Sequence, residues 1–368
     1  MTRTILIWKV VIAASAVLLI APYAIAKTVV VGTCIANLRS YTTISLAVSA
    51  VEAESTILVC PGNYPEQVTI TQPLTLRGVQ SGNSGNPTIT VPPGGLTKSV
   101  LLANGITMFY QVSAQATDSS AVNISNIGID GSNNAVTGIH WLAAILYQNA
   151  SGNVSHAATF NQKGNGYGFG IFLESSTASS KTISINQSSI HDYDAEGIRS
   201  NATHPTALTV SIKGNSVSPV VPTPQSSGAA IDIDGIGMIS GNRLISRQTS
   251  SGIGVAVLSG MTISNNTVVG FGIGIWPVGD SVTITSNKIS LATAGIVLSG
   301  TGHVVQHNSI FDTINGGAAI QFGCDSKQHT IIHNVINDSL IGIIHGDSTN
   351  VISPNAFSNV ERLTQPAC

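Results

Sequence analysis

The chain has 368 residues, of which 43 % are hydrophobic and only 9 % are charged, and its formal net charge is −2. These proportions exclude a disordered polyelectrolyte and a basic nucleic-acid-binding protein. The 37 glycines and the low aromatic share of 5 % favour many short strands and turns in one elongated domain.

The first 26 residues are predicted to form a secretory signal peptide. Arg3 and Lys9 give a charged start, Val10 to Ile20 is an apolar run, and Ala-Ile-Ala at 24–26 supplies the small-x-small cleavage signature. The apolar run is shorter than the ~20 residues of a membrane-spanning helix, so we expect cleavage rather than an anchor. The sequence therefore predicts a secreted or periplasmic protein, with no membrane span after cleavage.

Four cysteines remain in the exported chain: Cys34, Cys60, Cys324 and Cys368. An even number in an oxidising compartment favours two disulfides. Because a disulfide needs Cα atoms closer than ~7 Å, the two ends of a long rod cannot be joined. If the fold is such a rod, Cys34 pairs with Cys60 and Cys324 with Cys368. No Cys-x-x-Cys spacing supports the alternative of a metal site.

A repeat begins at about residue 183, in which an aliphatic residue is followed three positions later by Asn and two positions after that by another aliphatic residue. The Asn-to-Asn steps are 27, 24, 21, 21, 26 and 21 residues, and an earlier copy carries Ser188 in the Asn place. A base period of 21 with loop insertions is typical of a solenoid. The asparagines of this column are Asn215, Asn242, Asn266, Asn287, Asn308, Asn334 and Asn355.

A second element of each copy is built on Gly-Ile, as in Gly197-Ile198, Gly274-Ile275 and Gly295-Ile296. A unit of 21 residues with two or three short strands cannot bury both faces alone, so the units must stack. We expect hydrogen bonds between coils spaced at ~4.8 Å and an inward ladder of Asn side chains. The pattern predicts a right-handed parallel β-helix of about ten coils, and the Ile, Val and Gly content argues against a leucine-rich horseshoe.

The beginning of the mature chain resembles that of pectin lyase-like right-handed parallel β-helix proteins. The resemblance rests on residues 41–48 (YTTISLAV), 55–70 (STILVCPGNYPEQVTI) and 74–78 (LTLRG), and residues 122–134 (VNISNIGIDGSNN) resemble the next section of secreted bacterial β-helix repeat proteins. It implies a capping helix around Ile44 to Val51 and a Pro-Gly-x-Tyr-x-Glu turn that starts the coils, in which Glu66 has a structural role.

The resemblance implies one domain over 27–368. Residues 27–80 are its N-terminal cap and first coils, 81–350 are coils with loop insertions, and 351–368 are its C-terminal end.

The same resemblance does not fix the chemistry, because this superfamily includes lyases, esterases, hydrolases, epimerases and non-catalytic surface proteins. The segment 231–235 (IDIDG) lacks the aromatic positions of the pectin methylesterase motif, and that family's Trp-Gly-Arg segment is absent. The Asp-Asp and Gly-His-Gly signatures of polygalacturonases and the Asp-Pro-His segment of alginate-type epimerases are absent as well.

Two histidines, His307 and His333, precede successive asparagines of the repeat and are expected to lie in adjacent coils. Beyond Asp312 and Asp338 no third metal ligand is evident, so ordinary polar stacking is favoured over a metal site.

A candidate glycan site follows from aligning the Gly-Ile strands so that each residue after Ile points outward. Asp232, Asp234, Arg199 and Glu174 are the candidate catalytic groups, because carboxylates and a guanidinium suit hydroxyls or uronates, although Arg199 paired with Asp232 is a purely structural alternative. The candidate substrate-binding residues are His140, Phe172, Asn201, Trp276, His191 and Asp194. The full outward column reads His140, Phe172, Arg199, Asp232, Gly254, Trp276, Val297, Gln321 and Ile344.

Two functions of different class remain open. The first is a non-catalytic, monomeric β-helix that presents a polysaccharide-binding groove to a polysaccharide or cell-envelope glycan. The second is a lyase or glycoside hydrolase that acts on a uronate-containing or related glycan through the same face. No cofactor is identified, but the spacing of Asp232 and Asp234 also suits a bound calcium ion.

Overall fold

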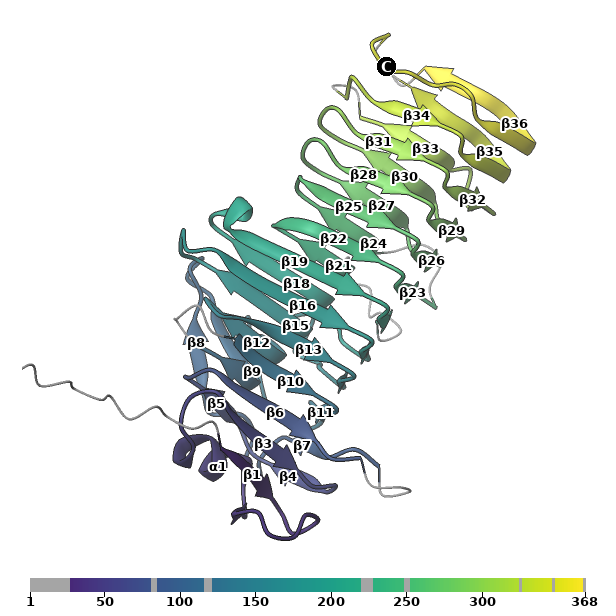
Figure 1. Ribbon diagram of the computed structural model, residues 1–368. Coiled ribbons are helices and arrows are strands. Elements are labelled where there is room, and N and C mark those ends of the chain that lie inside the picture. The colour runs from purple at the N-terminus through teal and green to yellow at the C-terminus, as the bar shows by residue number, and fades with distance from the viewer. Residues whose placement is uncertain are drawn as a thin grey trace, which may run out of the picture.

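The computed structural model describes residues 27–80, 85–115, 121–219, 228–247, 252–323, 326–345 and 348–366. Within these ranges the chain forms a right-handed parallel β-helix, whose coils stack from the N-terminal end to the C-terminal end of an elongated body (Figure 1). The predicted fold is confirmed. The predicted signal peptide, Cys324 and Cys368 lie outside the described residues.

Each regular coil contributes one strand to each of three parallel ladders, which we call the first, second and third ladder. The first ladder has thirteen strands. In ladder order these are β2 (Ser40–Tyr41), β1 (Thr28–Val31), β3 (Ser55–Val59), β6 (Leu74–Gly78), β10 (Ala121–Ser125), β13 (Ser151–Ser155), β16 (Lys181–Asn186), β19 (Leu208–Lys213), β22 (Ile236–Ser240), β25 (Met261–Ser264), β28 (Thr283–Thr285), β31 (Val304–Gln306) and β34 (Thr330–Ile332).

The second ladder follows directly after the Asn corner of each regular coil. Its strands are β4 (Asn63–Pro65), β7 (Thr88–Thr90), β11 (Gly128–Asp130), β14 (Ala158–Phe160), β17 (Ser189–His191), β20 (Ser216–Ser218), β23 (Arg243–Ile245), β26 (Thr267–Val269), β29 (Lys288–Ser290), β32 (Ser309–Phe311) and β35 (Val335–His345).

The third ladder carries the candidate site. Its strands are β5 (Val68–Ile70), β9 (Thr107–Ala114), β12 (Trp141–Gln148), β15 (Gly168–Ser175), β18 (Glu196–Ala202), β21 (Ala229–Ile233), β24 (Ile253–Val257), β27 (Ile273–Pro277), β30 (Ala294–Leu298) and β33 (Ala318–Phe322), followed by β35 and β36 (Ala356–Pro366). A short strand β8 (Ser99–Leu101) pairs antiparallel with β9, and a 3₁₀ turn spans Pro205–Ala207.

The predicted Asn ladder is present and continuous. The backbone N–H of each asparagine donates to the Oδ1 of the next, as from Asn266 to Asn287 at 3.0 Å and from Asn287 to Asn308 at 2.9 Å. Each side-chain amide also donates to the next Oδ1 and to a carbonyl, such as that of Ile263. Because these amides are buried, the ladder satisfies polar groups that would otherwise destabilise the narrow core.

The residue before six of the seven ladder asparagines turns the corner in the left-handed region of backbone space, and Pro354, before Asn355, is the exception. Its φ is 56° at Asn265, 57° at His307 and 56° at His333, and 67° and 65° at Gly214 and Gly241. Gly, Asn and a few other polar residues tolerate this conformation, which explains why the corner repeats a polar residue or Gly. The rings of His307 and His333 stack at 5.3 Å, as expected.

The N-terminal end is closed by helix α1 (Ile44–Ala50), which confirms the predicted capping helix and ends one residue earlier than expected. Ile44, Ala47 and Val48 face the core. The Glu66 carboxylate accepts hydrogen bonds from the backbone N–H groups of Ile44 and Ser45, at 2.8 and 2.9 Å. Glu66 therefore neutralises the N-terminal end of the helix, in line with its predicted structural role.

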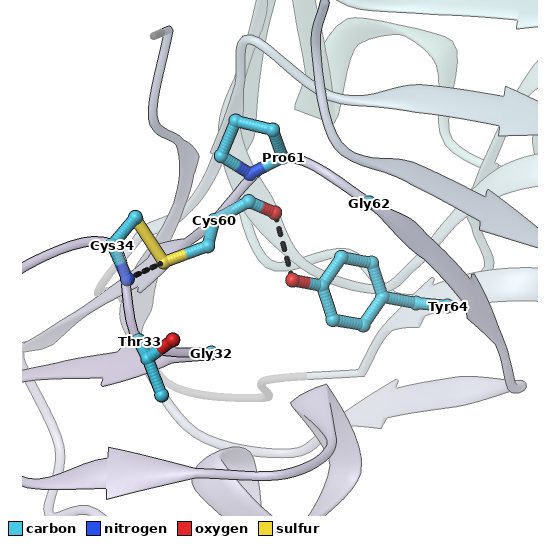
Figure 2. A pocket seen from close by; sticks show the side chains of 7 residues that line it. All are labelled: Gly32, Thr33, Cys34, Cys60, Pro61, Gly62 and Tyr64. Carbon is cyan, nitrogen blue, oxygen red and sulfur yellow. Dashed lines mark hydrogen bonds between the residues drawn. A yellow bond between two sulfur atoms is a disulfide. The ribbon is translucent and has the colours of Figure 1, made fainter. Parts of the chain in front are cut away.

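The Cys34–Cys60 disulfide is confirmed, with a Cα–Cα distance of 5.7 Å. Figure 2 shows the pocket of about 500 Å³ beside it, where the Tyr64 hydroxyl donates to the Cys60 carbonyl at 2.7 Å. The lining is glycine backbone, the disulfide, Thr33, Pro61 and this one phenol, so the pocket offers no charged group to a ligand. No helix within the described ranges is long and apolar enough to cross a membrane.

Candidate functional site

The outer face of the third ladder brings several of the predicted residues into one column. Phe172 stands in register with Arg199, and Arg199 with Asp232. Asp232 then pairs with Ala256, and Ala256 with Trp276. The predicted order is therefore right from Phe172 to Trp276, except that Ala256 takes the place expected for Gly254.

His140 is a second correction to the column. It precedes β12 and lies edge-on against Phe109 at 5.7 Å. The residue of β12 that pairs with Phe172 is Leu146. Ile139, which was expected to point inward, is 76 % exposed, so His140 does not belong to this face.

The centre of the site is an ion cluster on neighbouring strands. Nη1 of Arg199 donates to both carboxylate oxygens of Glu196, at 2.9 and 3.1 Å, and to Oδ2 of Asp232 at 2.8 Å. Nε of the same guanidinium is buried and has no hydrogen-bond partner among the described residues. Glu196 was not among the predicted residues, yet both of its carboxylate oxygens accept from Arg199.

A bend in β18 explains why Glu196 and Arg199 share one face although they are three residues apart. A Cβ at Gly197 would lie 2.4 Å from Val217 and 2.6 Å from the carbonyl of Ala230, so that position faces the packed interior. Ile198 is also fully buried. Gly197 and Ile198 are thus two successive residues that face inward, so that Glu196 before them and Arg199 after them both face outward. In a strand with regular alternation, residues three apart would lie on opposite faces.

Burial sets the electrostatics of this cluster. It raises the pKa of Glu196 to about 7, against the lowering by Arg199, and Asp232 and Asp234 add smaller rises. Burial likewise raises the pKa of Asp232 to about 6. The pKa of Asp234 is raised by burial too, and its backbone N–H donates to the Ser200 hydroxyl at 2.6 Å. The cluster can therefore hold a protonated carboxyl beside an ionised one near neutral pH.

An aromatic platform lies one coil before the ion cluster. Phe169 pairs with Glu196 and Phe172 with Arg199 across the ladder. Trp141 packs on both phenylalanines, with ring centroids 5.1 and 5.6 Å apart. Phe172 is fully buried by this packing, so it supports the platform and does not face a ligand, contrary to its predicted contact role.

A pocket of about 310 Å³ joins the platform to the ions, with Trp141, Tyr167, Phe169, Glu196 and Arg199 among its lining residues. Asp194 shapes its rim. The Asp194 carboxylate accepts three backbone N–H bonds, from Gly164, Gly166 and Gly168, at 2.9, 3.0 and 2.7 Å. Asp194 is therefore at the site, as predicted, where it fixes the loop that carries Tyr167.

Glu174 and Asn201 form a separate pair beside this cluster. The Glu174 carboxylate is buried, accepts from the Asn201 amide at 3.0 Å, and accepts from the backbone N–H of Ala103 at 2.8 Å. Both oxygens are engaged in holding the 102–106 turn against the ladder. This corrects the prediction of Glu174 as a catalytic group.

Trp276 and His191 lie farther from the centre. Trp276 is two coils beyond Asp232, about 10 Å along the rod, and its indole N–H donates to Ser299 at 3.0 Å. His191 belongs to β17 and lines a different pocket on the second ladder, so it is not part of the third-ladder site. Across the described residues, no group of three or more His, Cys, Asp or Glu is arranged to hold a metal ion.

Comparisons with known proteins agree with this architecture. The family described as "Right handed beta helix region" matches residues 200–357. No curated protein matches the chain. Among solved structures, the mannuronan C-5 epimerase AlgE6 A-module of Azotobacter vinelandii is similar, with a TM-score of 0.53 and 14 % identity over 85 % of this chain and 93 % of the other.

Two further structures have the same architecture. A tailspike protein of E. coli bacteriophage HK620, in complex with a pentasaccharide, has a TM-score of 0.53 and 12 % identity over 84 % of this chain and 62 % of the other. DFA-IIIase of Arthrobacter chlorophenolicus A6, without its lid and in complex with GF2, has a TM-score of 0.50 and 14 % identity over 82 % of this chain and 88 % of the other. With its three stacked ladders and its Asn corner, the chain has the right-handed parallel β-helix fold.

Proposed function

We propose that the protein binds a glycan on the third-ladder face, at the pocket between Trp141 and the Arg199 cluster. The observation that carries this proposal is the joining of an aromatic platform to the Arg199 guanidinium and the Glu196 carboxyl in one pocket, with Asp232 bonded to the same guanidinium. Aromatic faces pack on pyranose rings, and the charged groups suit hydroxyls or a uronate carboxylate. The similar structures whose names include a mannuronan epimerase and a pentasaccharide-bound tailspike also support a glycan ligand.

The place of action is part of the same proposal. The N-terminal segment has the features of a signal peptide, and a disulfide joins Cys34 to Cys60. Both support a protein that works in the periplasm or outside the cell, since disulfides persist in oxidising compartments. We propose that it acts there as a monomer.

Glycoside hydrolysis is the second candidate, and one observation favours it. Glu196 and Asp232 both bind the same nitrogen of Arg199, at 2.9 and 2.8 Å, so their bonded oxygens can be no farther apart than the sum of these two distances. The pKa of Glu196, at about 7, suits a general acid at neutral pH. Glu196 would then protonate the leaving oxygen while Asp232, ionised, faces the anomeric carbon.

The experiment is a glycan array read with the purified protein, followed by a reducing-sugar assay and an absorbance assay for unsaturated products on every glycan that binds. Binding without product supports the non-catalytic role, whereas product formation that is lost in Glu196→Gln supports hydrolysis. An array repeated in EDTA tests whether calcium takes part.

The matched variants are Arg199→Ala and Arg77→Ala. Arg77 is exposed on β6, in the first ladder, so its loss should leave binding unchanged. Equal binding by the wild-type protein and by folded Arg199→Ala would contradict the assignment of this site.

A further inference from the structure

A second pocket, which shares no residue with the first, lies on the outer side of β17, β20 and β23. Its volume is about 310 Å³. It opens on the second ladder, so the turn at residues 192–195 separates it from the third-ladder site. Its lining residues are His191, Asp192, Ser216, Ser218, Pro219, Arg243, Ile245 and Arg247.

Two guanidinium groups dominate the charge of this pocket. Arg243 and Arg247 are both exposed, and neither forms an ion pair with any residue that the structure describes. The neighbouring stretches 220–227 and 248–251 contain no acidic residue in the sequence. In a protein with a formal net charge of −2, two unpaired arginines at one pocket form a local positive excess.

The only carboxylate that lines the pocket is already engaged. Oδ2 of Asp192 lies 2.7 Å from Nδ1 of His191, which orients the imidazole and leaves Nε2 without a partner among the described residues. The ring also stacks on Phe160, with centroids 5.4 Å apart and planes 6° apart. Asp192 and Phe160 therefore fix the position of His191 at the pocket wall.

The rest of the wall is held by the ladder itself. Ser216 stands in register with Arg243, and His191 with Ser218. Neighbouring strands are spaced at ~4.8 Å, so hydroxyl groups and guanidinium groups alternate at fixed separations. Such a frame reduces the conformational entropy that the protein must lose when a ligand binds.

We propose that this second-ladder pocket binds a small sugar through an oxyanion that the sugar carries, which is a sulfate or carboxylate group. Guanidinium groups donate two parallel hydrogen bonds to such oxyanions, and Ser216 and Ser218 can bind the sugar hydroxyls. The pocket has the size of a small-ligand site. A nucleic acid fits less well, because the negative net charge provides no long-range attraction for a polyphosphate. This inference does not depend on the proposed function, since the two pockets have no residue in common.

The test measures the thermal midpoint of the full chain with inorganic sulfate, galactose 6-sulfate, galacturonate and neutral galactose, each against chloride at equal ionic strength. A ligand that binds only the folded state raises the midpoint. We expect the three anions to raise it and galactose to leave it unchanged. Galactose 6-sulfate should bind about tenfold more tightly than inorganic sulfate, because the serine hydroxyls add hydrogen bonds to the sugar.

Variants decide where the anion binds. Arg243→Gln with Arg247→Gln should abolish the response while the circular dichroism spectrum stays unchanged, and Arg77→Gln should keep it. An unchanged response in the double variant would overturn the proposal, as would an equal response to galactose. Tighter binding of a thymidine oligonucleotide, lost in the same double variant, would overturn the sugar ligand in favour of a nucleic acid.

Discussion

Arg199 and Asp232 stand in register on adjacent strands, and Nη1 of Arg199 lies 2.8 Å from Oδ2 of Asp232. This pairing was the structural alternative to a ligand-binding role. The pairing leaves room for the proposed ligand-binding role, because the same guanidinium also holds Glu196 and lines the pocket beside Trp141. A ligand at this pocket would meet a cation whose charge is already shared between two carboxyls of raised pKa.

The first prediction concerns stability against pH. Glu196 has a pKa of about 7 in the folded protein and 4.5 as its ordinary value, so the folded state binds more protons between these values. The contribution of Glu196 to stability should therefore be fully present below about pH 4.5 and fall as the pH rises to about 7. Glu196→Gln should flatten this fall, as measured by urea unfolding at several pH values.

Arg199→Ala should make stability fall more steeply as the pH rises from about 4.5 to about 7. Removing one partner of a fully buried ion pair costs ~3–5 kcal/mol, and the loss here should be smaller because Glu196 and Asp232 are 12 % and 24 % exposed. The loss should be larger at pH 8 than at pH 5, where the carboxyls can be protonated. A loss that is equal at both pH values would contradict the account of the cluster.

The second prediction has the opposite sign and concerns a buried histidine pair. His303 and His329 stack at 4.9 Å, and the backbone N–H of His303 donates to Nδ1 of His329 at 3.1 Å. Burial lowers the pKa of His329 from 6.5 to about 4, so the unfolded state binds more protons in that interval. The contribution of His329 to stability should therefore fall as the pH drops from 6.5 to 4.

The size of this acid loss follows from the pKa difference. Each unit corresponds to ~1.4 kcal/mol, so a difference of about 2.5 units gives a loss of roughly 3 kcal/mol by pH 4. His329→Asn should remove this part of the acid loss, because an Asn side chain does not take up a proton and can accept the same backbone hydrogen bond, as Asn350 does from His329. The matched control, His333→Asn, lies at the exposed corner and should retain the acid loss. Thermal unfolding at pH 4, 5 and 6.5 distinguishes the two variants.

The third prediction concerns the Asn ladder. Asn287→Ala would remove the acceptor of two bonds from Asn266 and the donor to Ile263. Since a buried polar group without its partner costs ~1–3 kcal/mol, the free energy of unfolding should fall by roughly 2–4 kcal/mol. The neighbouring control, Asn265→Gly, keeps the left-handed corner and should change stability little. Similar losses for the two variants would argue against the ladder as the stabilising element.

The fourth prediction concerns the N-terminal cap. Replacing Cys34 and Cys60 by Ser should lower the free energy of unfolding by about 2–4 kcal/mol, because the disulfide restricts the unfolded chain. Guanidinium unfolding of the double variant measures this loss. Peptide mapping under non-reducing conditions checks the other predicted bond, between Cys324 and Cys368; a linkage from one end of the rod to the other would contradict the fold.

Much of the fold could be predicted because it depends on a periodic requirement. Every coil must turn a corner and satisfy its buried amides, so Asn266, Asn287 and Asn308 recur at fixed spacing. The register of the third ladder was harder to predict, because Gly252-Ile253 resembles Gly197-Ile198 but lies two residues before the position that pairs with the inward residue of β21. Val255, not Ile253, pairs with the inward isoleucine of β21.

The site was predicted in part for a related reason. Arg199 and Asp232 follow from simple alternation, whereas Glu196 does not, because the Gly197 bend interrupts that alternation. The signal available in the sequence was a carboxylate directly before a Gly-Ile pair. Glu174 stands in register with Asn201, as alternation predicts. Its contact with the backbone of Ala103 could not be predicted, because that residue comes from a turn 71 residues away.

The most direct test of glycan binding at the third-ladder face uses Trp141 as a reporter. The chain has three tryptophans, at 8, 141 and 276, so the variant with Trp8→Phe and Trp276→Phe keeps Trp141 alone. Titration with a glycan that binds on the array should change the Trp141 fluorescence with the dissociation constant found by calorimetry, and Arg199→Ala should weaken both together. Calorimetric binding that leaves the Trp141 emission unchanged would contradict the assignment.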